Sequence, residues 1–180
     1  MKLQNNLATS KISAISKGLV EIQGQLLMKS PLNSPITTED CIGYHYKIEK
    51  VERDKDGKKS YTTIHEETQC NPFEIEDDTG RIEIIPDGIE IFLMKQTNID
   101  CAGRKRYTET LLKQGQKMLL IGYADSNNGT PFIRKDEHYS LLGISPISGV
   151  GLWNKYLLLL QSFLFTWFII ISLIVLILLQ

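Results

Sequence analysis

Short runs of alternating apolar and polar residues, separated by turn residues, occupy most of residues 18–134. Residues 19–26 alternate partly with period two, and residues 41–53 and 60–67 flank the turn sequence at 54–58. Period-two alternation puts apolar side chains on one face of a strand, and an Asp-Lys-Asp-Gly-Lys sequence favours a tight turn between antiparallel strands. We therefore expect three strands here, the last two forming a hairpin.

The same pattern continues in the second half of the chain. Strands are expected at 73–76, 81–85, 89–95, 117–124 and 131–134, with turns at 77–80, 86–88 and 126–129. Short helical pieces are expected at 9–15, closed by Gly18, and at 107–113, with irregular chain at 96–106. Many short strands joined by Gly, Asn and Asp turns predict a mainly β domain, a small OB-like β-barrel.

A long apolar segment, residues 156–180, has no charged side chain. A helix from Leu157 to Leu179 would be about 35 Å long at about 1.5 Å per residue, and the hydrocarbon core of a bilayer is about 30 Å thick. Trp153 and Lys155 stand before it, where interfacial anchors are common. A helix apolar on every face suits a membrane better than the core of so small a chain, so we expect one C-terminal transmembrane α-helix.

Charge limits the classes of partner. The chain has 20 Lys and Arg against 21 Asp and Glu, a net charge of −1, whereas non-specific nucleic-acid binding requires excess positive charge. Two basic clusters, 55–59 and 104–106, are interpreted as solvated loops. No apolar signal segment is visible at the N-terminus, which predicts a cytoplasmic domain on a C-terminal anchor. The expected organisation is an N-terminal segment (1–17), a β domain (18–140), a linker (141–155) and the transmembrane helix (156–180).

Asp78-Thr79-Gly80 is the loop triplet of aspartic proteases. That chemistry requires two aspartates sharing one proton in a dry site. Here Glu76 and Asp77 stand before the triplet, where apolar residues would be expected. We therefore interpret the segment as a structural turn in which Asp bonds backbone amides and the glycine has φ > 0.

Cysteine and histidine residues offer no clear metal site. Cys41 with His45, and His65 with Cys70, have the residue types of a zinc quartet. Residues four apart in a strand are about 13 Å apart, whereas zinc–ligand bonds are about 2.0–2.3 Å long. We assign no metal, cofactor or catalytic residue. The odd count of three cysteines, with wide spacing, does not suggest a disulfide framework.

An ordered series of landmarks runs through about residues 9–140. We interpret its residues as structural: Gly18, Gly24, Pro35, Cys41, Tyr44, Tyr46, Pro72, Phe73, Asp77, Gly80, Pro86, Gly88, Glu109, Gly115 and Gly122. This series resembles the GIDE, or "beside-a-membrane", domain of mitochondrial membrane-anchored E3 ubiquitin ligases and their bacterial relatives. The resemblance implies a β-rich, OB-like domain next to the bilayer.

The sequence departs from this family in two ways. Relatives usually carry a membrane span before the domain, and none is visible here. The ligases end in a RING finger, which needs eight Cys or His ligands for two zinc ions, whereas this chain has three Cys and three His. RING-based ubiquitin transfer by this chain is therefore excluded by ligand count.

The expected function is that of a membrane-anchored, non-catalytic interaction or assembly module without a cofactor. Its partners would be the membrane, through a single span, and an unidentified protein, with a second copy of the chain among the options. One alternative is the role of the ubiquitin ligase family carried out with a separate catalytic subunit. Another is an aspartic protease using the triplet at 78–80.

Overall fold

The computed structural model describes residues 9–138 and 140–147. The chain divides into two compact units, Met1–Pro146 and Ile147–Gln180, and the described structure lies almost wholly in the first. The predicted membrane segment, 156–180, lies outside the described residues. Within the described ranges, no helix combines the length and the apolar character needed to cross a bilayer.

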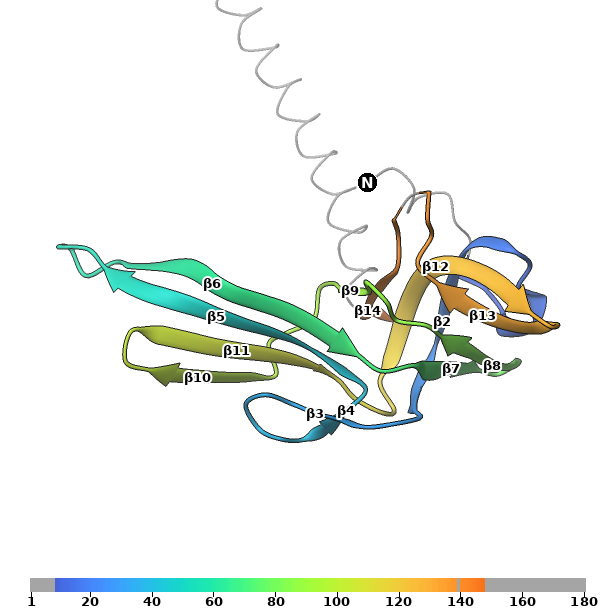
Figure 1. Cartoon of the computed structure of the whole chain (residues 1–180), viewed down its shortest axis with the longest axis horizontal. Helices are drawn as coiled ribbons and strands as arrows, with labels where there is room; N and C mark the ends of the chain where they lie inside the picture. Colours follow the sequence, from blue (N-terminus) through green and yellow to red (C-terminus); the bar gives the residue numbers. More distant parts are fainter. Residues whose placement is uncertain (1–8, 139, 148–180) are drawn as a thin grey trace, which may run out of the picture. The chain divides into compact units, whose positions relative to one another are not determined.

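The described part is mainly β, with one short 3-10 helix (Figure 1). The elements in chain order are β1 (Thr9–Ser10), η1 (Ile12–Ala14), β2 (Gly18–Met28), β3 (Leu32–Asn33), β4 (Asp40–Cys41), β5 (Gly43–Arg53), β6 (Lys59–Cys70), β7 (Phe73–Asp77), β8 (Gly80–Ile84), β9 (Glu90–Ile91), β10 (Asn98–Ala102), β11 (Lys105–Leu112), β12 (Lys117–Asn127), β13 (Thr130–Arg134) and β14 (Gly143–Pro146).

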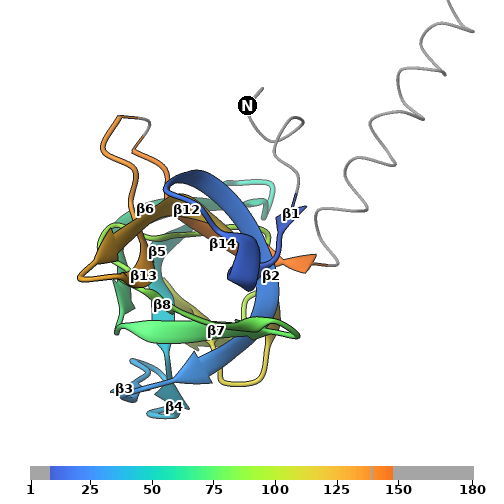
Figure 2. The same cartoon turned by 90° about the vertical axis from the view of Figure 1, so that its right-hand side faces the viewer.

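Five strands close into a barrel. They lie in the order β2, β7, β8, β13 and β12, and β12 pairs back onto β2 (Figure 2). Neighbouring barrel strands are antiparallel except β8 and β13, which are parallel. Numbered along the chain, the barrel order is therefore first, second, third, fifth and fourth. The expectation of a mainly β barrel domain is confirmed.

Alternation along the strands fills the barrel with apolar side chains. Phe73 and Ile75 of β7 are fully buried, while Glu74 between them is partly exposed. Ile22 of β2 and Ile133 of β13 complete the same core and are also fully buried. Phe73 and Ile75 therefore point into the barrel, as period-two alternation in the strand expected at 73–76 requires.

Two glycines allow the barrel to close tightly. A Cβ added to Gly24 would lie 2.4 Å from the carbonyl oxygen of Glu76 on the neighbouring strand. A Cβ added to Gly122 would lie 2.6 Å from Cγ2 of Ile133. Contacts this short do not occur for real side chains, so the strands approach one another only because these positions carry no side chain.

A separate four-stranded sheet, in the order β10-β11-β5-β6, is built from two insertions into the barrel. The hairpin β5–β6 lies in the connection between β2 and β7, and the hairpin β10–β11 lies in the connection between β8 and β12. The two hairpins join because β5 pairs antiparallel with β11, from Gly43 opposite Leu112 to Lys50 opposite Lys105. Figure 1 shows this sheet running away from the barrel.

Several local expectations are wrong. Residues 9–15 form strand β1 and a three-residue 3-10 turn, because β1 pairs in parallel with β2. Of residues 107–113, expected to be helical, 107–112 belong to β11, where pairing on both sides outweighs local helix propensity. The irregular stretch contains β10. The expected linker at 141–155 contains β14, which pairs with β12.

Candidate interaction surface

The four-stranded sheet has a small core of its own where it leaves the barrel. Cys41, Tyr44 and Leu111 are buried together, and Leu32 packs against them from the β3–β4 hairpin. Leu111 lies opposite Tyr44 in the register, so this core covers one face of the sheet near the barrel.

A buried carboxylate holds the neighbouring loop in place. Glu109 of β11 is fully buried. Its side-chain oxygens accept hydrogen bonds from the Thr37 hydroxyl at 2.8 Å, the Asn98 side-chain amide at 2.8 Å and the Ile36 backbone amide at 2.9 Å. The Ser34 hydroxyl makes a longer contact at 3.5 Å. Because a buried carboxylate without such donors is costly, this cluster ties the loop after β3 to the sheet.

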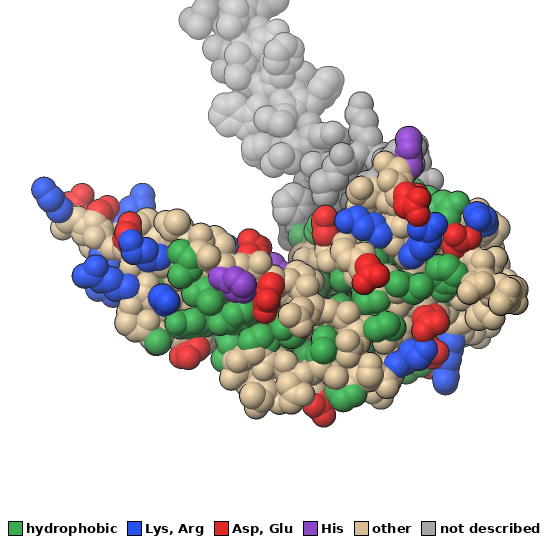
Figure 3. Space-filling model, viewed as in Figure 1, with side chains coloured by type: hydrophobic (Ala, Val, Ile, Leu, Met, Phe, Trp, Pro, Cys, Tyr) green, Lys and Arg blue, Asp and Glu red, His purple; other side chains and the backbone are tan. Residues whose placement is uncertain are grey.

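Beyond this core, one face of the sheet carries a partly exposed apolar stripe. The register places Ile48 of β5 opposite Tyr107 of β11 and His65 of β6, so the three side chains share a face. Tyr46 lies on the same face, and its ring meets the His65 ring edge-on with the centroids 6.1 Å apart. Figure 3 shows hydrophobic side chains gathered over the middle of this sheet.

The opposite face is polar and internally paired. Glu49 is buried and lies between two cations, with Lys47 at 2.9 Å and Arg106 at 3.3 Å. The Arg106 guanidinium also lies over the Tyr61 ring, 5.3 Å from its centroid. These contacts hold β11, β5 and β6 together. They also pair the charges of Lys47, Glu49 and Arg106 with one another.

The tip of the sheet farthest from the barrel has unpaired positive charge. The backbone amide of Val51 donates to the carbonyl oxygen of Arg104 at 2.7 Å, which places the 104–106 cluster at the same end of the sheet as the turn that carries the 55–59 cluster. Figure 3 shows Lys and Arg side chains at this end of the β5–β6 hairpin. Within the described part of the chain, no ion pair reaches the side chains of Arg53, Lys55, Lys58, Lys59, Arg104 and Lys105.

Strand β6 forms one edge of the sheet. It has 12 residues, most of them exposed. Two of its apolar side chains, Tyr61 and Ile64, are 47% and 50% exposed. An exposed edge strand presents unpaired backbone N–H and C=O groups, which are groups that bind another strand.

The Asp-Thr-Gly segment forms a turn, but with roles different from those expected. Asp77, rather than Asp78, bonds the turn. One oxygen of Asp77 accepts from the Thr79 amide at 2.7 Å and the Gly80 amide at 3.1 Å, and the other accepts from the Ile12 amide at 3.0 Å. Burial raises the pKa of Asp77, but the hydrogen bonds from Thr79, Ile12 and Gly80 outweigh it and leave this pKa below its usual value.

Two details of that turn bear on the protease alternative. Asp78 is exposed and pairs with Lys11, so it does not lie in a dry site with a second aspartate. Gly80 has no positive φ, so the expectation that it does is wrong. A Cβ at Gly80 would lie 3.6 Å from Cγ2 of Ile12, an ordinary contact. The geometry therefore supports a structural turn that anchors η1.

The cysteines and histidines do not converge. His45 bonds Thr68 at 3.0 Å and Glu66 at 3.2 Å, and its position in the register puts it on the face opposite to His65. Among the described residues, no three Cys, His, Asp or Glu side chains gather as a metal site. Burial, followed by the charge of Cys41, raises the pKa of the Cys70 thiol to about 12.

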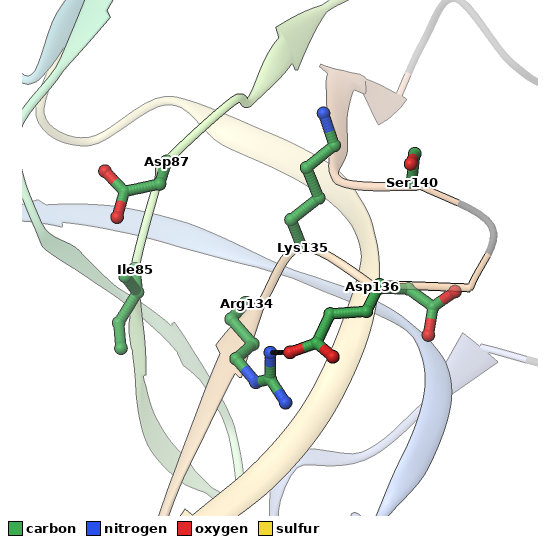
Figure 4. Close-up of a pocket in the computed structure, with 7 residues that line it drawn as sticks. Ile85, Asp87, Arg134, Lys135, Asp136 and Ser140 are labelled. Carbon is green, nitrogen blue, oxygen red and sulfur yellow. Dashed lines mark hydrogen bonds and ion pairs between the residues drawn. The ribbon is translucent and has the colours of Figure 1, made fainter.

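Two shallow hollows lie on the described surface. One, of about 330 Å³, is lined by Arg134, Lys135, Glu137 and neighbouring residues (Figure 4). Arg134 is paired with Glu137 and with Asp125. Figure 4 shows the Lys135 side chain pointing away from the Arg134 side chain. The other hollow, of about 430 Å³, lies beside His45 and has glutamates and Phe92 in its wall. In the second hollow, Nδ1 of His45 lies 3.0 Å from the Thr68 hydroxyl and Nε2 lies 3.2 Å from a Glu66 oxygen, at an exposed position between β5 and β6.

The motif residues are spread over the barrel sheet, the four-stranded sheet and the β3–β4 hairpin rather than gathered at one site. They lie in β2 (Gly18 and Gly24), β4 (Cys41), β5 (Tyr44 and Tyr46), β7 (Phe73 and Asp77), β8 (Gly80), β11 (Glu109), β12 (Gly122) and the connections (Pro35, Pro72, Pro86, Gly88 and Gly115).

The sequence does not reveal the main surface feature. The basic clusters at 55–59 and 104–106 give no sign that they lie at the same end of one sheet, and residues 107–113 predict a helix where the structure has most of β11. The alternation of Thr108 and Thr110 with other residues was the available signal for a strand. Comparisons with models of known protein families, with characterised proteins and with solved structures found no match.

Proposed function

We propose that this chain is a membrane-anchored, non-catalytic interaction module whose four-stranded sheet docks a protein partner. One observation carries the proposal: two insertions into a closed barrel build an open sheet with an exposed edge strand and partly exposed apolar side chains. A sheet face or edge of this kind is a common site of protein association.

The barrel topology supports an OB-like domain, which is the fold that the resemblance to GIDE domains implies. In the OB-fold, five strands form a Greek-key barrel, and the face of the second and third strands is a common site for oligonucleotides. Here the corresponding strands are β7 and β8, whose outward positions include Glu74, Glu76, Arg81 and Glu83. Glu76 pairs with Arg81 and Glu83 pairs with Lys29, so this face has no excess of positive charge to attract a phosphate backbone, which favours a protein partner over a nucleic acid.

Site-specific photo-cross-linking in native membranes tests the docking role. A photoreactive residue at Ile48, Tyr61 or Ile99 should give adducts of discrete mass, because these side chains lie on the sheet. The same residue at Glu83 or Thr130, on the barrel, is the matched control and should give none. Absence of sheet adducts, or equal adducts from the barrel, would contradict the docking role.

Two further measurements test the anchor and its orientation. The full chain should stay with membranes after an alkaline wash, and release into the supernatant would refute the anchor. In sealed vesicles of known orientation, protease should cleave the β domain only from the cytoplasmic side. Ubiquitin transfer together with a separate catalytic subunit remains the alternative role, and the identity of the adducts would reveal such a subunit.

A further inference from the structure

The outer edge of β6 has an ordered charge distribution. Its distal end carries Lys58 and Lys59, which have no ion-pair partner in the described part of the chain. Its proximal end carries Glu66 and Glu67. Among the described residues, the one ion-pair contact of Glu66 is with His45, at 3.2 Å. An antiparallel pair of identical strands therefore brings the basic end of each copy opposite the acidic end of the other.

A β-bulge makes the faces match as well. Lys59 pairs with Arg53 and Glu66 pairs with Lys47, so Lys59 and Glu66 lie on the same face of the sheet. This happens because β6 has one extra residue opposite the step from Ile48 to Glu49. Directly opposite residues in an antiparallel pair must share a face. Without the extra residue, this pairing of Lys59 with Glu66 would place the two charges on opposite faces.

The exposed apolar side chains fit the same alignment. When Lys59 lies opposite Glu66, Tyr61 lies opposite Ile64, and these two are among the most exposed large apolar residues of the described surface. A cross-strand pair of an aromatic and a β-branched residue is favourable in antiparallel sheets. Each contact occurs twice about a two-fold axis, as in an isologous dimer.

We propose that the partner of the β6 edge is a second copy of this chain. The two edges pair antiparallel with Lys59 opposite Glu66 of the second copy, and two four-stranded sheets become one continuous sheet. This proposal rests on the docking role proposed above and names its partner. A bulge and charged residues also protect sheet edges from pairing, so the experiment must distinguish a dimer from a protected edge.

Disulfide cross-linking of the full chain in its membrane provides the first test. All variants carry Cys101→Ser, which removes the exposed thiol. Thr62→Cys places a thiol beside the two-fold axis, within disulfide range of its copy. Lys59→Cys is the matched control on the same strand, because its two copies would be about 20 Å apart, six ladder positions at about 3.3 Å each. We expect several-fold more dimer from Thr62→Cys, and equal yields would refute the alignment.

Exchange of charges provides the second test, with the Thr62→Cys cross-link as readout. Lys59→Glu alone and Glu66→Lys alone should each lose most of the dimer, because like charges then face one another. Mixing the two variants should restore it, since both charge pairs become attractive again. Loss of the His45 contact in Glu66→Lys cannot explain that recovery, because the contact is lost in the mixture too.

Control outcomes separate the possible failures. Lys55→Glu changes an unpaired cation in the turn outside the edge and should leave the dimer intact. If it abolishes the cross-link as fully as Lys59→Glu does, the tip charge acts on a membrane or another polyanion, and the edge pairing is refuted. Photo-adducts with other proteins but no self-cross-link would refute the self-association alone. Absence of all sheet adducts would refute the docking role itself.

Discussion

Replacing Asp77 by alanine would remove the side chain that closes the β7–β8 turn and anchors η1. Four hydrogen bonds end on its two oxygens, from the Thr79 amide, the Thr79 hydroxyl, the Gly80 amide and the Ile12 amide. Each buried or partly buried hydrogen bond contributes about 0.5–1.5 kcal/mol. Because the site is only partly buried, we expect Asp77→Ala to lower the free energy of unfolding by about 2–4 kcal/mol.

Two further variants, at positions 77 and 78, show which contacts of the turn contribute to stability. Asp77→Asn keeps one oxygen for the turn but offers an amide to the Ile12 N–H, so it should cost less, about 1 kcal/mol for the lost bond. Asp78→Ala removes an exposed ion pair with Lys11 and should have little effect. An aspartic protease would instead require Asp78 for activity, independently of stability.

Hydrogen exchange measured by mass spectrometry is the suitable assay, with chemical denaturation of the full chain beside it. In Asp77→Ala, amides of the segment containing Ile12 should exchange on the order of tenfold faster or more, since about 1.4 kcal/mol is a factor of ten. Unchanged exchange there would refute the anchoring role. So would a loss of stability from Asp78→Ala equal to that from Asp77→Ala.

The lowered pKa of Asp77 fixes the dependence on pH. A carboxyl whose pKa is lower in the folded state stabilises that state above its unfolded pKa of about 4. The stabilisation is lost as the pH falls through the lower, folded value. The difference in stability between wild type and Asp77→Ala should therefore be constant from neutral pH to about pH 5 and shrink in stronger acid.

Three other predictions test the fold. Gly24→Ala should prevent or severely weaken barrel closure, whereas Gly80→Ala should fold normally. Melting followed by circular dichroism tests this, and a lower melting temperature for Gly80→Ala than for Gly24→Ala would refute the assigned contacts. Glu109→Ala should leave buried donors unpaired and cost about 2–5 kcal/mol, and a cost below about 1 kcal/mol in denaturation would refute its anchoring role. At pH 8, alkylation should modify the exposed Cys101 rapidly and Cys70 hardly at all, because the pKa of Cys70 is raised to about 12.

The parts of the fold that follow local patterns could be predicted from the sequence. The alternation around Phe73 and Ile75 identified β7 and its buried face, because the period of side chains along a strand does not depend on the rest of the molecule. The Asp54 turn was predictable for the same reason, since the Asp54 side chain bonds the amides of Asp56 and Lys58 within the turn itself.

The features that depend on distant pairing could not be predicted. Residues 107–113 contain a strand signal in the alternation of Thr108 and Thr110, but nothing local shows that they lie between two other strands. The glycine at position 80 was expected to need a positive φ because of its turn sequence, but Asp77 supplies the turn bonds without it. The candidate surface itself exists only because β5 meets β11, and neither hairpin indicates its partner.

The joining of two insertions into one sheet has a consequence for the order of folding. Each hairpin closes a short loop and can form within microseconds, whereas the contact of Gly43 with Leu112 must wait until distant parts of the chain meet. The barrel brings these two residues together, because β5 and β11 both connect to barrel strands near them. We expect the joined sheet to be completed late in refolding, so that newly made chains expose unpaired hairpin edges until the barrel has closed.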